Sequence, residues 1–185
     1  MSSDCDYRKL STAVPKELAK RVSEALLVQS TIAREKYDAY NLPLICNEIT
    51  TTVETVSTPI WLICWTVLMS WKQENLNLLS QLFHRRLKRD HVFAGKFRET
   101  QATPSLPKRT GARDEIYVTI ALTDLSPDNG WYIFYEGSRA DHPIPDEDRT
   151  VRIRLEAGDA LIWRGDLVYT HPTGGGGMFQ TLVYK

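Results

Sequence analysis

The sequence predicts an α+β protein, in which a mainly helical first half packs on a second half made of strands. Residues 16–37 place apolar side chains at helical spacing, whereas residues 151–155 alternate apolar and polar side chains with a period of two. The chain has 185 residues, which is enough for one domain with a hydrophobic core. We therefore expect a single domain over 1–185, with a mainly helical part at 15–99 and a β part at 115–185.

The first half contains two helical stretches and one long apolar run. Pro15 suits the first turn of a helix, and the stretch that follows it ends by Asn41-Leu42-Pro43. A second helix is expected over 76–87. The run from Ile60 to Trp71 is uncharged, but its 12 residues are fewer than the roughly 20 that span a membrane. We expect a buried helix or strand pair there, with an interfacial anchor or a partner-docking face as alternatives.

The second half alternates strand-like runs with turns rich in glycine, aspartate and asparagine. The expected strands are 116–122, 131–135, 151–155, 160–163, 167–171 and 179–184. His171 ends one of them, just before Pro172 and four glycines that we expect to form a mobile loop. Polar rings at strand ends beside loops often carry chemistry in β-barrels, although a surface histidine is the plainer interpretation.

Composition excludes several broad classes of protein. The 23 basic and 23 acidic side chains cancel, so no net charge favours nucleic acid or an anionic membrane. Cys5, Cys46 and Cys64 are widely spaced and odd in number, which suits a reducing compartment better than a disulfide framework. The first ten residues lack the apolar core of a signal peptide. We therefore expect a cytoplasmic protein with no nucleic-acid partner and no membrane span.

Residues 115–184 carry a series of short motifs in a recognisable order. The motifs are Leu122-Thr123-Asp124, Asp128-Asn129-Gly130, Gly137-Ser138-Arg139 and Gly158-Asp159-Ala160. In order and spacing this region resembles the C-terminal core of the phytanoyl-CoA dioxygenase-like family. That family consists of iron(II)/2-oxoglutarate oxygenases built on a double-stranded β-helix, also called a jelly-roll or cupin-like barrel. The resemblance implies such a core here, left incomplete because the helical first half does not match the family's N-terminal strands.

The resemblance also implies a set of metal and cosubstrate residues, most of which this sequence lacks. The family binds iron through His-x-Asp or His-x-Glu and a distal histidine, and an arginine on the last strand holds 2-oxoglutarate. Residues 92–114 contain no histidine. The distal position falls at Tyr169 or at His171, whose side chains share one face of a strand. Neutral Gln180 stands where the arginine is expected.

We therefore favour a degenerate member of this superfamily, whose barrel binds a small hydrophobic molecule or a protein partner without the iron triad. No cofactor is expected, no residue is assigned as a metal ligand, and His171 is the candidate acid or base. The candidate substrate-binding residues near the expected barrel mouth are Trp131, Arg139, Trp163, Tyr169 and Gln180.

Two alternatives remain open. One is an active iron(II)/2-oxoglutarate-dependent oxygenase that acts on a small hydrophobic metabolite through relocated ligands. Those ligands would be His171 with one of the other histidines and one carboxylate, drawn from His84, His91, His142, Asp114 and Glu115. The other is a structural or interaction subunit that docks on a protein partner through the run from Ile60 to Trp71. Its partner could be a second copy of this chain, which would make a dimer.

Overall fold

The computed structural model describes residues 6–34, 71, 73–83, 86–97, 104–109, 111–138 and 147–185. The helices are α1 (Lys16–Arg34) and α4 (Gln73–Phe83). The strands are β1 (Tyr7–Leu10), β2 (Arg89–Lys96), β3 (Ile116–Ala121), β4 (Ile133–Tyr135), β5 (Thr150–Arg152), β6 (Ala160–Arg164), β7 (Tyr169–Thr170) and β8 (Met178–Tyr184). A 3-10 turn, η1 (Glu147–Arg149), precedes β5.

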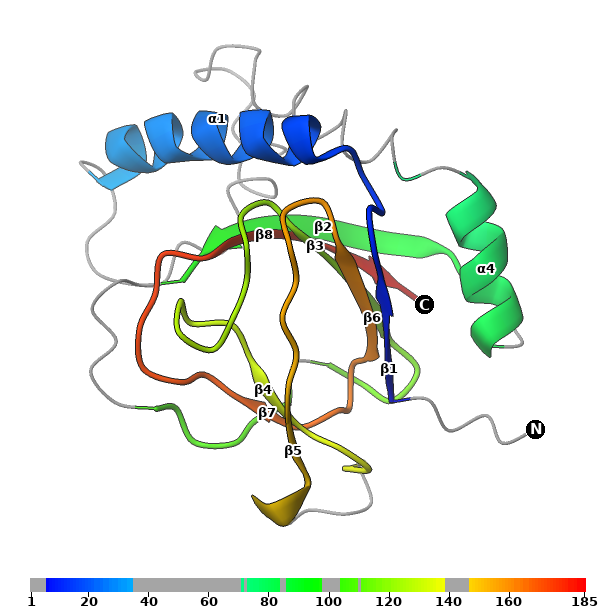
Figure 1. Ribbon diagram of the computed structural model, residues 1–185. Helices are drawn as coiled ribbons and strands as arrows, with labels where there is room; N and C mark the ends of the chain where they lie inside the picture. Colours follow the sequence, from blue (N-terminus) through cyan, green and yellow to red (C-terminus); the bar gives the residue numbers. More distant parts are fainter. Residues whose placement is uncertain are drawn as a thin grey trace.

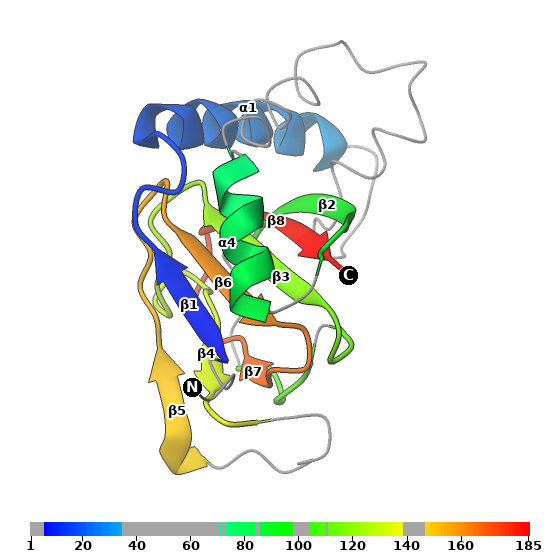
Figure 2. The same cartoon turned by 90° about the vertical axis from the view of Figure 1, so that its right-hand side faces the viewer.

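The strands form two antiparallel sheets. The main sheet has the order β1-β6-β3-β8-β2, and the small sheet has the order β5-β4-β7. Figures 1 and 2 show the helices on one side of the main sheet and the small sheet on its other side. An isolated bridge between Lys108 and Tyr169 extends the small sheet beyond β7. This is the arrangement of a cupin-like β-sandwich core, mostly antiparallel sheet with few helices.

Alternation along β8 creates two separate cores, because successive side chains of a strand point to opposite faces. Met178, Leu182 and Tyr184 pack with residues of α1 and α4 in the helix-side core. Phe179 and Val183 pack with residues of the small sheet in the interior core between the two sheets. Aromatic side chains dominate the interior core, which holds Phe97, Tyr117, Trp131, Tyr132, Phe134, Trp163, Tyr169 and Phe179.

The structure supports the predicted strands better than the predicted helical half. β3, β4, β6 and β8 lie within or beside the expected runs, and α1 begins at Lys16 as expected. A mainly helical part at 15–99 is not supported, because β2 is a full strand of the main sheet and β1 joins the same sheet from the N-terminal side. Both strands pair with partners far away in sequence, β6 and β8, so local periodicity does not reveal them.

The apolar run from Ile60 to Trp71 lies outside the described residues except for its last member. Trp71 is buried in the helix-side core. Within the described ranges, no helix combines the length and the apolar character that a membrane crossing requires.

Candidate functional site

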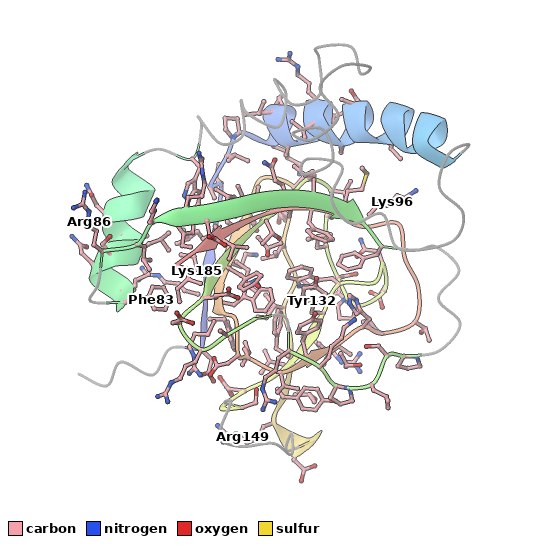
Figure 3. All side chains as sticks on the ribbon, turned by 180° about the vertical axis from the view of Figure 1, so that it is seen from behind. Phe83, Arg86, Lys96, Tyr132, Arg149 and Lys185 are labelled. Carbon is pink, nitrogen blue, oxygen red and sulfur yellow. The ribbon has the colours of Figure 1, made fainter. Side chains whose placement is uncertain are left out.

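The candidate site lies at the end of the interior core where β7 leads into the glycine-rich segment. The ring of His171 lies 4.8 Å from that of Tyr132 and 5.5 Å from those of Phe97 and Tyr169. We call these four residues the His171 cluster. Figure 3 shows Tyr132 in the interior, beneath the main sheet and above the small one. Tyr169 and His171 share a face as predicted, since their rings are in contact.

The backbone around His171 is held by the segment that contains Ser105. The Ser105 N–H donates to the His171 carbonyl at 2.8 Å, and the His171 N–H donates to the Ser105 hydroxyl at 2.9 Å. The Thr170 hydroxyl donates to the Ser105 carbonyl. The ring of His171 places Nδ1 3.4 Å from the carbonyl oxygen of Gly130. Contacts on two sides therefore fix the position of the imidazole.

The backbone of the glycine-rich segment after His171 is hydrogen-bonded to two neighbouring segments. The Gly176 N–H donates to the Phe97 carbonyl at 2.9 Å, and the Gly177 N–H donates to the Asn129 carbonyl at 3.1 Å. Gly174 has a φ of +102°, and a Cβ there would lie 2.4 Å from the carbonyl oxygen of Asp128. Gly174 thus allows a close approach between two backbone segments.

Burial controls the protonation of the His171 cluster. It lowers the pKa of His171 to about 4, helped by the nearby charge of Lys108 and opposed by the Gly130 carbonyl. Burial also raises the pKa of Tyr132 well above its usual value and lowers the pKa of Lys108. At neutral pH the cluster therefore holds a neutral imidazole and a protonated phenol, with an ammonium group beside them.

We expect His171 to make the protein less stable in acid. The pKa of His171 is about 4 in the folded protein against a reference value of 6.5, so between these values only the unfolded chain takes up the proton. Stability should fall by on the order of 3 kcal/mol as the pH drops from above 6.5 to 4. Urea unfolding across this range should show a shallower pH dependence for His171→Gln, and parallel curves would contradict the assignment.

The middle of the interior core is filled by Trp163. Its indole N–H donates to the Thr119 hydroxyl at 3.1 Å, and Thr119 is 2.9 Å from the hydroxyl of Thr181. Its ring lies 4.7 Å from that of Tyr117. Trp163 is 2% exposed and Trp131 is 0% exposed, so both lie in the interior core.

Gln180 does not face the His171 cluster. It pairs in register with Ile120 and Ala94, which belong to the helix-side core, and opposite residues of paired strands share a face. Gln180 therefore lies on the other side of the main sheet from Phe179 and Thr181. The candidate Arg139 lies outside the described residues.

The proposed relocated metal ligands are not brought together where the structure describes them. Glu115 accepts from the Ala112 N–H and the Tyr117 hydroxyl and pairs with Lys185 at 3.2 Å. It adjoins Ile116, which pairs with the far end of β8 at Tyr184, whereas the His171 cluster lies near Phe179. The two ends are about 15–20 Å apart at roughly 3.3 Å per residue. Figure 3 likewise shows Lys185 and Lys96 at opposite ends of the sheet.

The histidines other than His171 give no nearby ligand in the described ranges. His91 pairs through its backbone with Val183, again toward the end of β8 remote from the cluster. His84 and His142 lie outside the described residues, and Asp114 stands beside Glu115. Among the described side chains, no three of the histidine, cysteine, aspartate and glutamate type converge.

Three residues of the site were not among the sequence candidates. Phe97 and Lys108 come from segments with no strand-like pattern, so nothing in the local sequence identifies them. Tyr132 lies in the predicted aromatic strand 131–135, from which the sequence predicts Trp131 as the substrate-binding residue. The alternation within that strand could have indicated Tyr132 as an equal candidate.

No family model and no curated protein matches the sequence. Solved structures do match. AviO1 from Streptomyces viridochromogenes Tue57 is 14% identical with a TM-score of 0.66, over 98% of this chain and 90% of that one. HygX from Streptomyces hygroscopicus, with nickel and 2-oxoglutarate bound, is 11% identical with a TM-score of 0.67, over 97% of this chain and 82% of that one.

A third similar structure is SnoN, a non-heme α-ketoglutarate-dependent epimerase from nogalamycin biosynthesis. It is 13% identical with a TM-score of 0.62, over 97% of this chain and 76% of that one. At such identities the likeness shows the fold alone. This chain has the fold of 2-oxoglutarate-dependent non-heme enzymes, and the comparisons do not single out the phytanoyl-CoA dioxygenase-like family.

Proposed function

We propose that this protein is a degenerate member of the iron(II)/2-oxoglutarate oxygenase superfamily, whose barrel binds a small hydrophobic molecule or a protein partner without the iron triad. One observation carries the proposal. The interior that the two sheets enclose is packed with aromatic rings beside the imidazole of His171, and among the described residues no three side chains of the histidine, cysteine, aspartate and glutamate type converge. One imidazole holds a divalent metal poorly, because affinity comes from several ligands in fixed positions.

The His171 cluster suits the binding of a flat, weakly polar molecule. Tyr132 and Tyr169 are buried aromatic residues whose ring centroids are 4.3 Å apart, and a bound aromatic molecule would extend this packing. His171 is neutral at physiological pH, so it can accept a proton from a bound hydroxyl group or return one to it. The buried Trp131 Nε1–H has no acceptor among the described residues, and an oxygen of a ligand would satisfy it.

An active oxygenase is the second candidate. It is favoured by the fold itself, which this chain shares over 97% of its length with a HygX structure that holds nickel and 2-oxoglutarate. Under this candidate, iron(II) and 2-oxoglutarate are the cofactors. The missing ligands would come from outside the described residues, with His84 and His142 as the available imidazoles and Arg139 as the available cation.

Metal and cosubstrate analysis separates the two candidates. The purified chain would be loaded anaerobically with iron(II) and 2-oxoglutarate, and bound iron would be measured. Air would then be admitted and released succinate measured, with SnoN, an α-ketoglutarate-dependent epimerase, treated in parallel as the positive control. We expect neither stoichiometric iron nor succinate above the no-protein blank. Stoichiometric iron with succinate release that His171→Ala abolishes would contradict the proposal and establish the oxygenase.

We further propose a cytoplasmic location, which rests on the number and spacing of the three cysteines. The third candidate function is that of a structural or interaction subunit that forms a dimer. Light scattering coupled to gel filtration measures the oligomeric state and so tests for the dimer. A strictly monomeric protein over the accessible concentration range would remove the support for a homodimer.

A further inference from the structure

We propose that Asn129 is a site of spontaneous deamidation, which the folded turn at 124–130 delays and whose products disturb the contact between Gly130 and His171. Asn129-Gly130 is the one Asn-Gly pair in the sequence, since the other four asparagines precede leucine or glutamate. Glycine carries no side chain to hinder the attack of its amide nitrogen on the preceding asparagine. This chemistry does not depend on the proposed function, because it belongs to the turn itself.

Deamidation needs water but no oxidant and no enzyme, because asparagine is a thermolabile residue. The Gly130 nitrogen attacks Cγ of Asn129, the new N–Cγ bond closes a succinimide ring, and the bond from Cγ to Nδ2 breaks as ammonia leaves with the amide proton. Water then opens the ring. Attack at Cγ gives aspartate, and attack at the main-chain carbonyl carbon gives isoaspartate. The net change is one water consumed and one ammonia released.

The folded turn restrains both reacting groups. Oδ1 of Asn129 accepts from the Ser126 N–H at 2.9 Å, and its Nδ2 donates to the Asp124 carbonyl at 2.6 Å. The Gly130 N–H donates to the Pro127 carbonyl at 3.3 Å. Rotation of the Asn129 carboxamide toward the Gly130 nitrogen breaks both side-chain bonds. The reaction should therefore proceed from a locally open turn, and the folded turn should slow it.

The turn uses both members of this reactive pair for structural reasons. Gly130 has a φ of +94°, and a Cβ there would lie 2.6 Å from the Cβ of Phe97, so a larger residue is strained. Asn129 supplies a donor and an acceptor together, whereas an ionised aspartate only accepts. The fold therefore keeps a labile dipeptide beside the His171 cluster.

Both products weaken the contacts that the turn makes. In aspartate an ionised oxygen takes the place of Nδ2, so the bond to the Asp124 carbonyl is lost. In isoaspartate the main chain runs through Cγ, and the Asn129 carbonyl, which accepts from the Gly177 N–H at 3.1 Å, becomes part of a free carboxylate. The added main-chain carbon displaces Gly130, whose carbonyl oxygen lies 3.4 Å from Nδ1 of His171.

Timed incubation of the full chain tests the site and its protection. Folded protein and the same chain in guanidinium chloride would be kept in mildly alkaline buffer, and deamidation at each asparagine would be quantified by peptide mass spectrometry. We expect Asn129 to react at least about tenfold more slowly in the folded chain, which corresponds to an opening free energy of about 1.4 kcal/mol or more. In the denaturant Asn129 should react faster than Asn75 and Asn77, which precede leucine. Equal rates in the folded and unfolded chains, or no preference for Asn129 in the denaturant, would overturn the inference.

Asn129→Asp supplies one product directly and tests the consequence for His171. Asn77→Asp makes the same chemical change at an exposed position of α4 and is the matched control. We expect Asn129→Asp alone to shift the ring resonances of His171 and to lower the midpoint of thermal unfolding. If that variant does not fold, the same resonances would be followed while the wild-type protein deamidates. Unshifted His171 resonances in the folded variant or in the deamidated protein would contradict the proposal.

Discussion

Replacing Arg164 by methionine is expected to destabilise the protein by about 3–5 kcal/mol, the cost typical of breaking a buried ion pair. The Arg164 guanidinium donates three bonds to the Asp166 carboxylate, at 2.7, 2.8 and 3.0 Å, and a fourth to Asp6 at 3.1 Å. Its side chain is 12% exposed and that of Asp166 is 1% exposed. Methionine would leave both carboxylates buried without the cation. Urea unfolding at neutral pH measures the change.

Two further variants control that measurement. Arg154→Met removes an exposed partner of Asp128 and should cost less than about 1 kcal/mol, because exposed ion pairs contribute little. The double variant Arg164→Met with Asp166→Asn should recover part of the lost stability, since it removes one of the stranded charges. Similar losses in Arg164→Met and Arg154→Met would show that the buried pair has no special role.

Replacing Gly130 by alanine is expected to cost at least about 2 kcal/mol and to disturb the His171 cluster. Gly130 has a φ of +94°, and a Cβ there would lie 2.6 Å from the Cβ of Phe97. A contact between two atoms so close to their backbones cannot be relieved by rotating a side chain. Phe97 would have to move away from His171, whose Nδ1 also faces the Gly130 carbonyl.

Thermal unfolding and the proton resonances of the His171 ring report the two effects of Gly130→Ala separately. Gly175→Ala is the matched control in the adjoining segment, because Gly175 does not have a positive φ and accepts a Cβ without backbone strain. We expect a lowered midpoint and shifted ring resonances for Gly130→Ala alone. Unshifted His171 resonances in that variant would argue against the close packing of Phe97 on the imidazole.

Local sequence patterns were sufficient to locate two strands of the second half that are buried on both faces. Alternation located β3 and the region of β8, and the turn residues between them marked where each strand ends. The same rule places Gln180 opposite to Phe179 and Thr181. This alternation rule does not say which face of β8 points into the interior core. The answer depends on the register with β3, where Gln180 pairs with Ile120 of the helix-side core.

Long-range pairing is what local patterns could not provide. β1 has four residues and two charged side chains, and it is a strand because β6 supplies its hydrogen bonds. Lys108 belongs to a proline-bearing segment that would be read as a loop, and only the bridge to Tyr169 brings it to the candidate site. The sequence alone shows that the family's His-x-Asp motif and last-strand arginine are missing. Which aromatic rings fill the interior could be learned only from the structure.

The place of β8 between β3 and β2 has a consequence for biosynthesis. The ribosome synthesises β8 after the other strands of that sheet. Nascent β2 therefore cannot pair with β8 until most of the remaining chain has been translated. A premature stop before Met178 would divide the sheet and leave the edges of β2 and β3 open to other chains. Messages truncated there should yield aggregates rather than a smaller soluble protein.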